Sequence, residues 1–164
     1  MEDLKAELDF AEETFGNFMK LWLEKDFPGT EGWKYFQESG NKKASIKSNL
    51  QNIFEHLLKL KYSSSKLEHS HWIDEIYAFI KEVRKDMYTD NSHKKLDRNI
   101  YNDIKDSVDK CFEKGFAVYR RDMKTNTSLP DISSIIPNKS PISIEEILVG
   151  DIDILLDKLP ELEG

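Results

Sequence analysis

Apolar residues recur every three or four positions between Lys42 and Tyr62, and this spacing constrains the fold more than any other feature of the sequence. The stripe consists of Ile46, Leu50, Ile53, Leu57 and Leu60. Because an α-helix has about 3.6 residues per turn, side chains with this spacing lie on one face. The segment therefore predicts an amphipathic helix that buries this face.

Three further segments repeat the pattern, at residues 1–26, 70–88 and 92–124. Their stripes comprise Leu4, Leu8, Ala11, Phe15, Phe18 and Trp22; Ile73, Ile76, Ile80, Val83 and Met87; and Leu96, Ile100, Ile104, Val108, Cys111 and Val118. Strand signals are limited to brief β-branched runs such as residues 132–136. We therefore expect an all-α fold, in which four long helices form a mostly antiparallel bundle with additional short helices.

Proline, glycine and capping residues predict where the helices begin and end. The first helix should stop before Phe27–Thr30, which contains Pro and Gly, and a short helix should follow and close at Gly40. The sequence Ser65–Glu68 has the form of a capping box and predicts the start of the third long helix, with Ser70 as an alternative. Gly115 lies inside the fourth helix and predicts a local bend or a close helix contact.

The C-terminal part lacks helical spacing at first. Residues 125–141 contain three prolines among Thr, Asn and Ser, a composition typical of an extended strap on the surface. A capping box at Ser143–Glu146 then predicts a short helix that ends at Gly150. Residues 151–158 predict one or two further helical turns.

Composition limits the organisation and the partners of the chain. Its 164 residues are the usual size of one domain, so we expect a single helical domain over 1–164, with a first helix at 1–26, a bundle core at 30–124 and the strap and short helix at 125–164. The formal charge of −7 opposes binding to nucleic acid or to an anionic membrane. A single cysteine, a charged N-terminus and the lack of a long apolar run predict a cytoplasmic protein with no membrane segment.

Three stretches resemble a known bacterial family. The first runs from Ser48 to Tyr62 around a His-Leu-Leu-Lys core, the second is the Ile-rich segment Trp72–Arg84, and the third is Pro141–Leu148. They resemble the family catalogued as domain of unknown function twenty-nine, over residues 30–157, whereas the first helix diverges from the usual opening of that family. The resemblance implies an all-helical fold and no assigned activity.

Three of the four histidines, His56, His69 and His71, fall within 16 residues. Zinc needs three or four converging ligands, of which a His-x-His pair could supply two. His56 lies about six residues before the end of one helix and the other two lie at the start of the next, so at least one turn separates them along the axis. We therefore expect structural histidines, with His69 and His71 as weak metal candidates, and no cofactor.

The remaining polar residues of interest lie at or inside the apolar faces. His56 should lie at the border of its stripe, with Asn49 or Tyr77 as a hydrogen-bond partner. Arg84 falls within the apolar arc of its helix and Asp97 within that of the next. In an antiparallel pair of helices these two should meet as an ion pair, which offsets most of the cost of burying either charge. The alternative is an arginine that binds an anionic ligand.

These observations favour a non-enzymatic interaction or regulatory protein. It would bind a partner protein, or it would bind a second copy of itself through the first helix. Candidates for an exposed contact patch are Trp22, Phe27 and Trp33. One alternative is an enzyme that binds a small ligand or metal and uses a polar site of His56, Arg84 and Asp97 between helices. Another is nucleic-acid binding through the basic residues at the end of the fourth helix.

Overall fold

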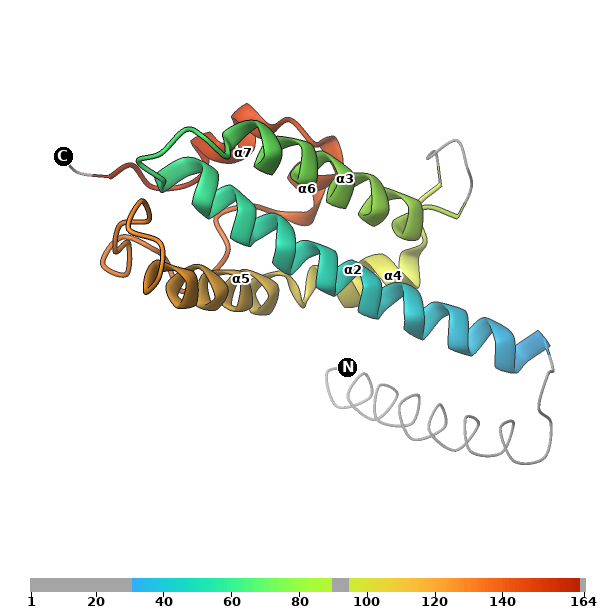
Figure 1. Ribbon diagram of the computed structural model, residues 1–164. Coiled ribbons are helices and arrows are strands. Elements are labelled where there is room, and N and C mark those ends of the chain that lie inside the picture. Colours follow the sequence, from blue (N-terminus) through green and yellow to red (C-terminus); the bar gives the residue numbers. More distant parts are fainter. Residues whose placement is uncertain (1–30, 90–94, 163–164) are drawn as a thin grey trace. The chain divides into compact units, whose positions relative to one another are not determined.

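Figure 1 shows the computed structural model of the chain, which describes residues 31–89 and 95–162. The chain divides into two compact units, residues 1–41 and 42–164. The helix expected at residues 1–26 and the aromatic side chains considered for a contact patch lie outside the described part. The expectation of one domain over the whole chain stays a prediction.

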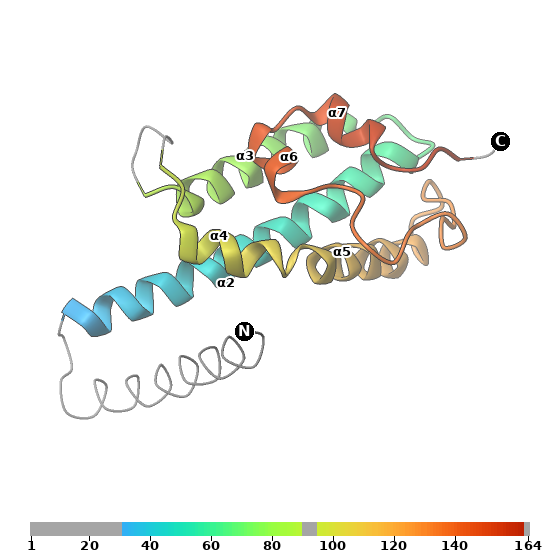
Figure 2. The same ribbon diagram turned by 180° about the vertical axis from the view of Figure 1, so that it is seen from behind.

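The described residues form an all-α fold, as the sequence predicts. The helices are α2 (Glu31–Tyr62), α3 (His69–Met87), α4 (Arg98–Lys105), α5 (Val108–Met123), α6 (Ile144–Val149) and α7 (Ile152–Asp157). Within the second unit, α3 runs back alongside α2, and α4 and α5 follow one another along a different side of α2 (Figures 1 and 2). None of the helices in the described ranges combines the length and the apolar character that a membrane crossing requires.

The apolar stripes of α2 and α3 meet in one buried core. Every residue of the predicted α2 stripe is at most 6% exposed. In α3, the residues Ile76, Ile80, Val83 and Met87 are equally buried. Burial of one such side chain stabilises a fold by roughly 1.5–3 kcal/mol, so the contact between these two faces is a main source of stability.

Helix α2 continues through Gly40, where the sequence predicts a boundary. A Cβ at Gly40 would meet no atom of the described residues within 4 Å, so none of these residues requires the helix to end there. Glycine inside a helix costs only about 1 kcal/mol relative to alanine, which the flanking turns can absorb. The prediction of separate helices on the two sides of Gly40 is wrong.

The predicted fourth long helix is two helices, α4 and α5, separated at Asp106 and Ser107. The backbone N–H of Ser107 donates to the Ile104 carbonyl at 2.8 Å, and its hydroxyl donates to the Asp103 carbonyl at 3.0 Å. These bonds close a tight turn. Stripe residues on both sides of the turn remain buried, so the apolar spacing gave no sign of the interruption.

Capping residues predicted one helix start correctly and one incorrectly. Helix α3 begins at His69 without a side-chain cap, and the Ser65 hydroxyl instead accepts a bond from the N–H of Leu67, so the capping box expected there is wrong. The capping box at Ser143–Glu146 is present. Gly150 ends α6 in the left-handed conformation, with a φ of 74°, as predicted.

The C-terminal segment is not a surface strap, because it completes the core. Its buried apolar residues, each at most 5% exposed, are Leu129, Ile132, Ile142, Ile144, Ile147, Ile152, Leu155 and Leu159. The segment passes beside α5 and then lies along α3, where α6 packs (Figure 2). The prediction failed because isolated apolar residues among prolines and polar residues have no period that reveals their burial.

Two buried tyrosines tie the C-terminal segment to α2 and α5. The Tyr62 hydroxyl donates to the Pro160 carbonyl at 2.6 Å, and the Tyr119 hydroxyl donates to the Pro130 carbonyl at 2.7 Å. Burial, together with the negative charge of Glu161, raises the pKa of Tyr62 to about 12. Burial also raises the pKa of Tyr119. Both phenols therefore stay protonated in the folded chain at a pH where an unfolded tyrosine, with a pKa of about 10, ionises.

We expect the free energy of unfolding to fall as the pH rises from about 10 to about 12. Because folding raises both pKa values, the stabilisation is complete below the unfolded pKa and disappears as the pH rises through the folded one. Urea denaturation at pH 9 and pH 11 measures the loss.

A chain with Tyr62→Phe and Tyr119→Phe should lose less stability over this interval than the wild type. Tyr77→Phe is the control, because Tyr77 is 51% exposed, and it should behave as the wild type does. Equal losses in all three chains would contradict the assignment to the two buried phenols.

Candidate functional site

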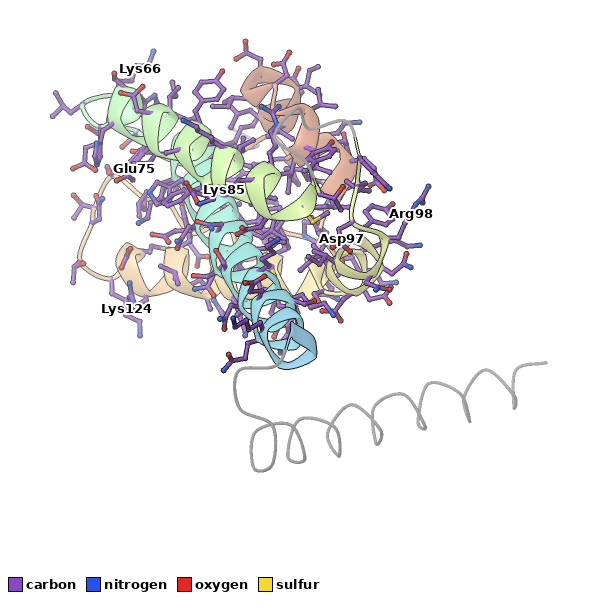
Figure 3. The ribbon with its side chains drawn as sticks, turned by 90° about the vertical axis from the view of Figure 1, so that its right-hand side faces the viewer. Lys66, Glu75, Lys85, Asp97, Arg98 and Lys124 are labelled. Atoms are coloured by element: carbon purple, nitrogen blue, oxygen red, sulfur yellow. The ribbon has the colours of Figure 1, made fainter. Side chains whose placement is uncertain are left out.

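The polar residues that the sequence groups together lie in two separate places. His56 bonds Glu75 in the first half of α3, whereas Arg84 lies near the end of that helix. These two α3 residues are nine positions apart, about 13 Å along a helix. Figure 3 also shows Glu75 and Asp97 well apart. The structure therefore does not bring His56, Arg84 and Asp97 together.

Both ring nitrogens of His56 have partners. Nδ1 lies 2.8 Å from the Asn52 carbonyl oxygen, and Nε2 bonds a carboxylate oxygen of Glu75. The Asn52 carbonyl oxygen can only accept a hydrogen bond, so Nδ1 donates to it, and Nε2 is occupied by its bond with the Glu75 carboxyl group. No ring nitrogen is left for proton transfer to a bound substrate. His56 thus fastens α2 to α3.

The partners predicted for His56 are wrong. The Asn49 side-chain amide donates to the Ser45 carbonyl at 3.0 Å, one turn earlier in α2. Tyr77 points to solvent, because the buried face of α3 is narrower than the sequence suggests. Glu75, on the adjacent side of α3, is the side chain that bonds His56 instead.

The two weak metal candidates have different neighbours. Nε2 of His71 lies 3.0 Å from Oε1 of Glu75. The ring of His69 lies beside Trp72, with centroids 5.7 Å apart, and its Nε2 is buried and has no hydrogen-bond partner among the described residues. Across residues 31–89 and 95–162, no three His, Cys, Asp or Glu side chains are arranged to hold a metal ion.

The sequence predicts that Arg84 pairs with Asp97. In the structure Arg84 instead binds the end of α6. Its Nε donates to the Leu148 carbonyl at 2.7 Å, and its Nη2 donates to the Val149 carbonyl at 2.6 Å. The last carbonyls of a helix lack partners within the helix, and the helix dipole favours a positive charge there. The predicted ion pair is wrong because the partner of Arg84 arrives 64 residues later in the chain. We call this contact the Arg84 clamp.

Asp97 caps the start of α4. Its Oδ1 accepts hydrogen bonds from the backbone N–H groups of Asn99 at 3.1 Å and Ile100 at 3.2 Å. Its own N–H donates to the Met87 carbonyl at 2.9 Å, which joins the start of α4 to the end of α3. Helix α4 therefore begins at Arg98, later than predicted.

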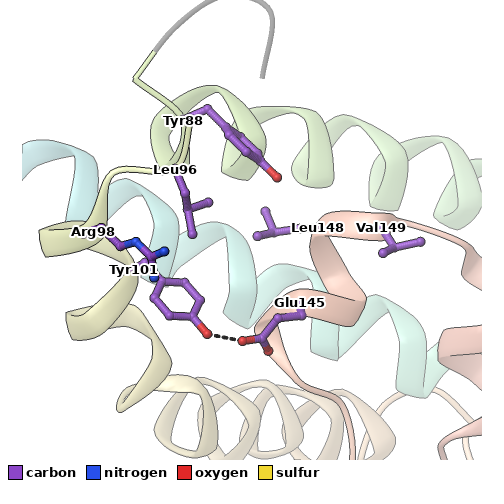
Figure 4. A pocket seen from close by; sticks show the side chains of 7 residues that line it. All are labelled: Tyr88, Leu96, Arg98, Tyr101, Glu145, Leu148 and Val149. Carbon is purple, nitrogen blue, oxygen red and sulfur yellow. Dashed lines mark hydrogen bonds between the residues drawn. The ribbon is translucent and has the colours of Figure 1, made fainter. Parts of the chain in front are cut away.

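Arg84 and Asp97 both support a hollow that we call the α3–α6 hollow (Figure 4). It is lined by Tyr88, Leu96, Arg98, Tyr101, Glu145, Leu148 and Val149. Its volume is about 390 Å³, and five of its seven residues are aliphatic or aromatic. It is the place where the end of α3, the start of α4 and helix α6 meet.

The walls of the hollow are fixed by specific contacts. Tyr88 and Leu96 form an antiparallel bridge, and the Arg84 clamp holds the backbone of α6. The Tyr101 hydroxyl bonds the Glu145 carboxylate across the hollow (Figure 4). This bond lowers the pKa of Glu145 and raises the pKa of Tyr101. Glu145 therefore contributes a negative charge to a hollow that Arg98 also lines with a positive charge.

Sequence reasoning identified none of the lining residues as functional. Tyr101 and Glu145 are 44 residues apart in the chain, and no periodic pattern relates them. The capping box at Ser143–Glu146 was the one available signal, because it located α6. It did not indicate that α6 packs against α3.

The comparisons with known proteins identify a family. Residues 38–152 match the family model described as "Domain of unknown function DUF29", which confirms the resemblance seen in the sequence. The matched range includes every residue of the α3–α6 hollow. No curated protein and no solved structure matches the chain.

Proposed function

We propose that this chain, which belongs to the DUF29 family of domains of unknown function, is a non-enzymatic interaction protein that binds a partner protein through the α3–α6 hollow. The occupant is an apolar side chain of the partner. The observation that carries the proposal is Val149, an apolar side chain that is 70% exposed at the hollow, although Ile144 and Ile147 of the same helix are buried.

The composition of the hollow fits a protein-binding surface. The centre of a protein interface is apolar and rich in tyrosine, and polar groups surround it. The aliphatic and tyrosine side chains supply such a centre, and Arg98 and Glu145 add one charge of each sign. A partner segment with an apolar side chain flanked by opposite charges would complement this arrangement.

The hollow is held in shape by the chain itself. The Arg84 clamp fixes the α6 wall, and the bond between Tyr101 and Glu145 joins that wall to α4. Binding to a preformed surface loses less conformational entropy than binding that must order mobile groups. The hollow therefore supports binding without rearrangement of its walls.

Photocrosslinking from the hollow tests the proposal. Benzoylphenylalanine replaces Val149 in one variant and Leu67, which is 93% exposed, in the matched control. In cells of the source organism, we expect a discrete protein adduct from position 149 that persists after nuclease treatment and is missing from position 67. Excess wild-type chain should compete the adduct away, whereas excess chain with Val149→Asp should not.

Val149→Asp should fold as the wild type does, because the substituted side chain is mostly in solvent, and thermal unfolding checks this. Equal adducts from positions 149 and 67, or an adduct that nuclease removes, would contradict the proposal. An adduct of twice the chain mass would identify a second copy of the chain as the occupant.

A further inference from the structure

A second hollow lies between α2 and α5, and we call it the lysine pocket. Its volume is about 370 Å³. The lining residues that matter here are Lys47, Ser48 and Gln51 from α2 and Lys110, Cys111 and Lys114 from α5. Three lysines therefore line one hollow, although the formal charge of the whole chain is −7.

The lysine pocket lies next to a close contact between the two helices. A Cβ at Gly115 would lie 2.9 Å from the Gln51 carbonyl oxygen and 2.9 Å from the Phe54 Cβ, so the backbones of α5 and α2 nearly touch at this point. Gln51 belongs both to the pocket and to this contact, and the other pocket residues precede the contact in the chain of each helix. Its walls are therefore two helices in close contact, together with Ser107 of the hydrogen-bonded turn before α5.

The pocket lysines have only loose counter-charges. Lys47 lies 3.5 Å from Asp103, and Lys110 lies 3.5 Å from Glu113, with all four side chains more than two-fifths exposed. Lys114 has no carboxylate within 4.0 Å among the described residues. Long, exposed pairs of this kind contribute little and leave the ammonium groups available to a ligand.

A lysine further along α2 shows the contrast. Lys59 bonds Glu55 at 2.8 Å and Asp122 at 2.7 Å, and its side chain is only 12% exposed. The bond from Lys59 lowers the pKa of the Asp122 carboxyl, as expected for a well-formed pair. Helix α2 thus holds Lys59 in two close ion pairs and leaves Lys47 of the pocket with one long, exposed pair.

The charges of Lys47 and Lys114 both affect the Cys111 thiol, which lines the pocket. Burial raises the pKa of the Cys111 thiol, and the positive charges of Lys114 and Lys47 oppose that rise. Both lysines and Cys111 line the same pocket, although Lys47 comes from α2 and Lys114 from α5. The Ser48 hydroxyl and the Gln51 amide make no hydrogen bond to another described residue. An anion between the lysines would offset their mutual repulsion and could accept bonds from these neutral groups.

We propose that the lysine pocket binds a small, soluble phosphate monoester through Lys47, Lys110 and Lys114. Phosphate oxygens accept strong charge-assisted hydrogen bonds from ammonium groups. The volume lies near the lower end of the roughly 300–1,000 Å³ of small-molecule sites, which favours a compact ligand. A polyanion such as nucleic acid is disfavoured, because it would face the negative charge of the whole chain as well as the pocket.

NMR titration of the full chain with inorganic phosphate and with O-phosphoserine, at constant ionic strength, tests this site. We expect saturable shifts of the amide signals of residues 47–51 and 107–114, and none with serine. Lys114→Gln should weaken the affinity about fivefold, and the double variant Lys47→Gln with Lys114→Gln should weaken it at least about tenfold.

Lys85→Gln is the matched control, because Lys85 forms a pair with Glu82 that has the same i,i+3 spacing and the same 3.5 Å distance as the Lys110 pair, but lies outside the pocket. It should bind both ligands with wild-type affinity. Shifts that do not saturate, or that persist in the double variant, would overturn the proposal. Sedimentation with phosphatidic acid vesicles tests the lipid source of the same chemistry, and vesicle binding without a response to either soluble ligand would also overturn it.

Discussion

Gly115→Ala should lower the free energy of unfolding by about 2 kcal/mol, although alanine is the better helix former. The new Cβ would lie 2.9 Å from the Gln51 carbonyl oxygen, 2.9 Å from the Phe54 Cβ and 3.1 Å from the Glu55 nitrogen. These atoms belong to the backbone of α2 or are attached directly to it, so none can move alone. The two helices must separate, and the lost packing exceeds the gain of about 1 kcal/mol in helix propensity.

The matched control is Gly40→Ala in α2. A Cβ at Gly40 would contact none of the residues that the structure describes, so alanine should raise the free energy of unfolding by up to about 1 kcal/mol. Urea denaturation followed by circular dichroism measures both variants. Gly115→Leu extends the series, because its longer side chain should prevent α2 and α5 from packing at all. Increased stability in Gly115→Ala would contradict the close helix contact.

Helical spacing predicted the core of α2 and α3 because an apolar stripe reports burial on one face whatever packs against it. The same signal is insensitive to interruptions that keep the stripe in phase. It therefore missed the turn at Asp106 and Ser107, while at Gly40 the local glycine signal predicted a break that the helix does not make. The first and last residues of a helix depend on individual hydrogen bonds to the backbone, such as those that the Asp97 side chain accepts at the start of α4.

The C-terminal segment and the α3–α6 hollow depend on contacts between residues far apart in the chain, which a single sequence does not reveal. Arg84 illustrates the limit. Its place in the apolar arc of α3 correctly indicated that the charge needs a partner. The position did not identify that partner, and two carbonyl oxygens of α6 fulfil the role that we assigned to Asp97.

Arg84→Met should lower the free energy of unfolding by about 2 kcal/mol. Methionine keeps an aliphatic stem for packing, so the loss reports chiefly the two bonds to Leu148 and Val149. Gly150→Ala should cost a similar amount for two reasons. Its φ of 74° is unfavourable for a residue with a Cβ, and that Cβ would lie 2.8 Å from Nη2 of Arg84.

Gly150→Asn separates these two causes, because asparagine tolerates the left-handed conformation but still introduces the Cβ. It should be less destabilising than Gly150→Ala and still weaken the Arg84 clamp. Urea denaturation provides the free energy of unfolding for each single and double variant.

A double-mutant cycle of Arg84→Met and Gly150→Ala should be less than additive, by at least about 0.5 kcal/mol, because removal of the guanidinium also removes the group that the new Cβ would displace. A cycle of Arg84→Met and Asp97→Ala should be additive within about 0.5 kcal/mol, because these residues share no bond. Coupling in the second cycle would restore the ion pair that the sequence suggested, and additivity in the first would contradict the clamp. The clamp also holds the α6 wall of the hollow. Arg84→Met should therefore weaken the crosslink from position 149 at temperatures where the variant remains folded. This result would link the stability of α6 to the proposed binding of a partner.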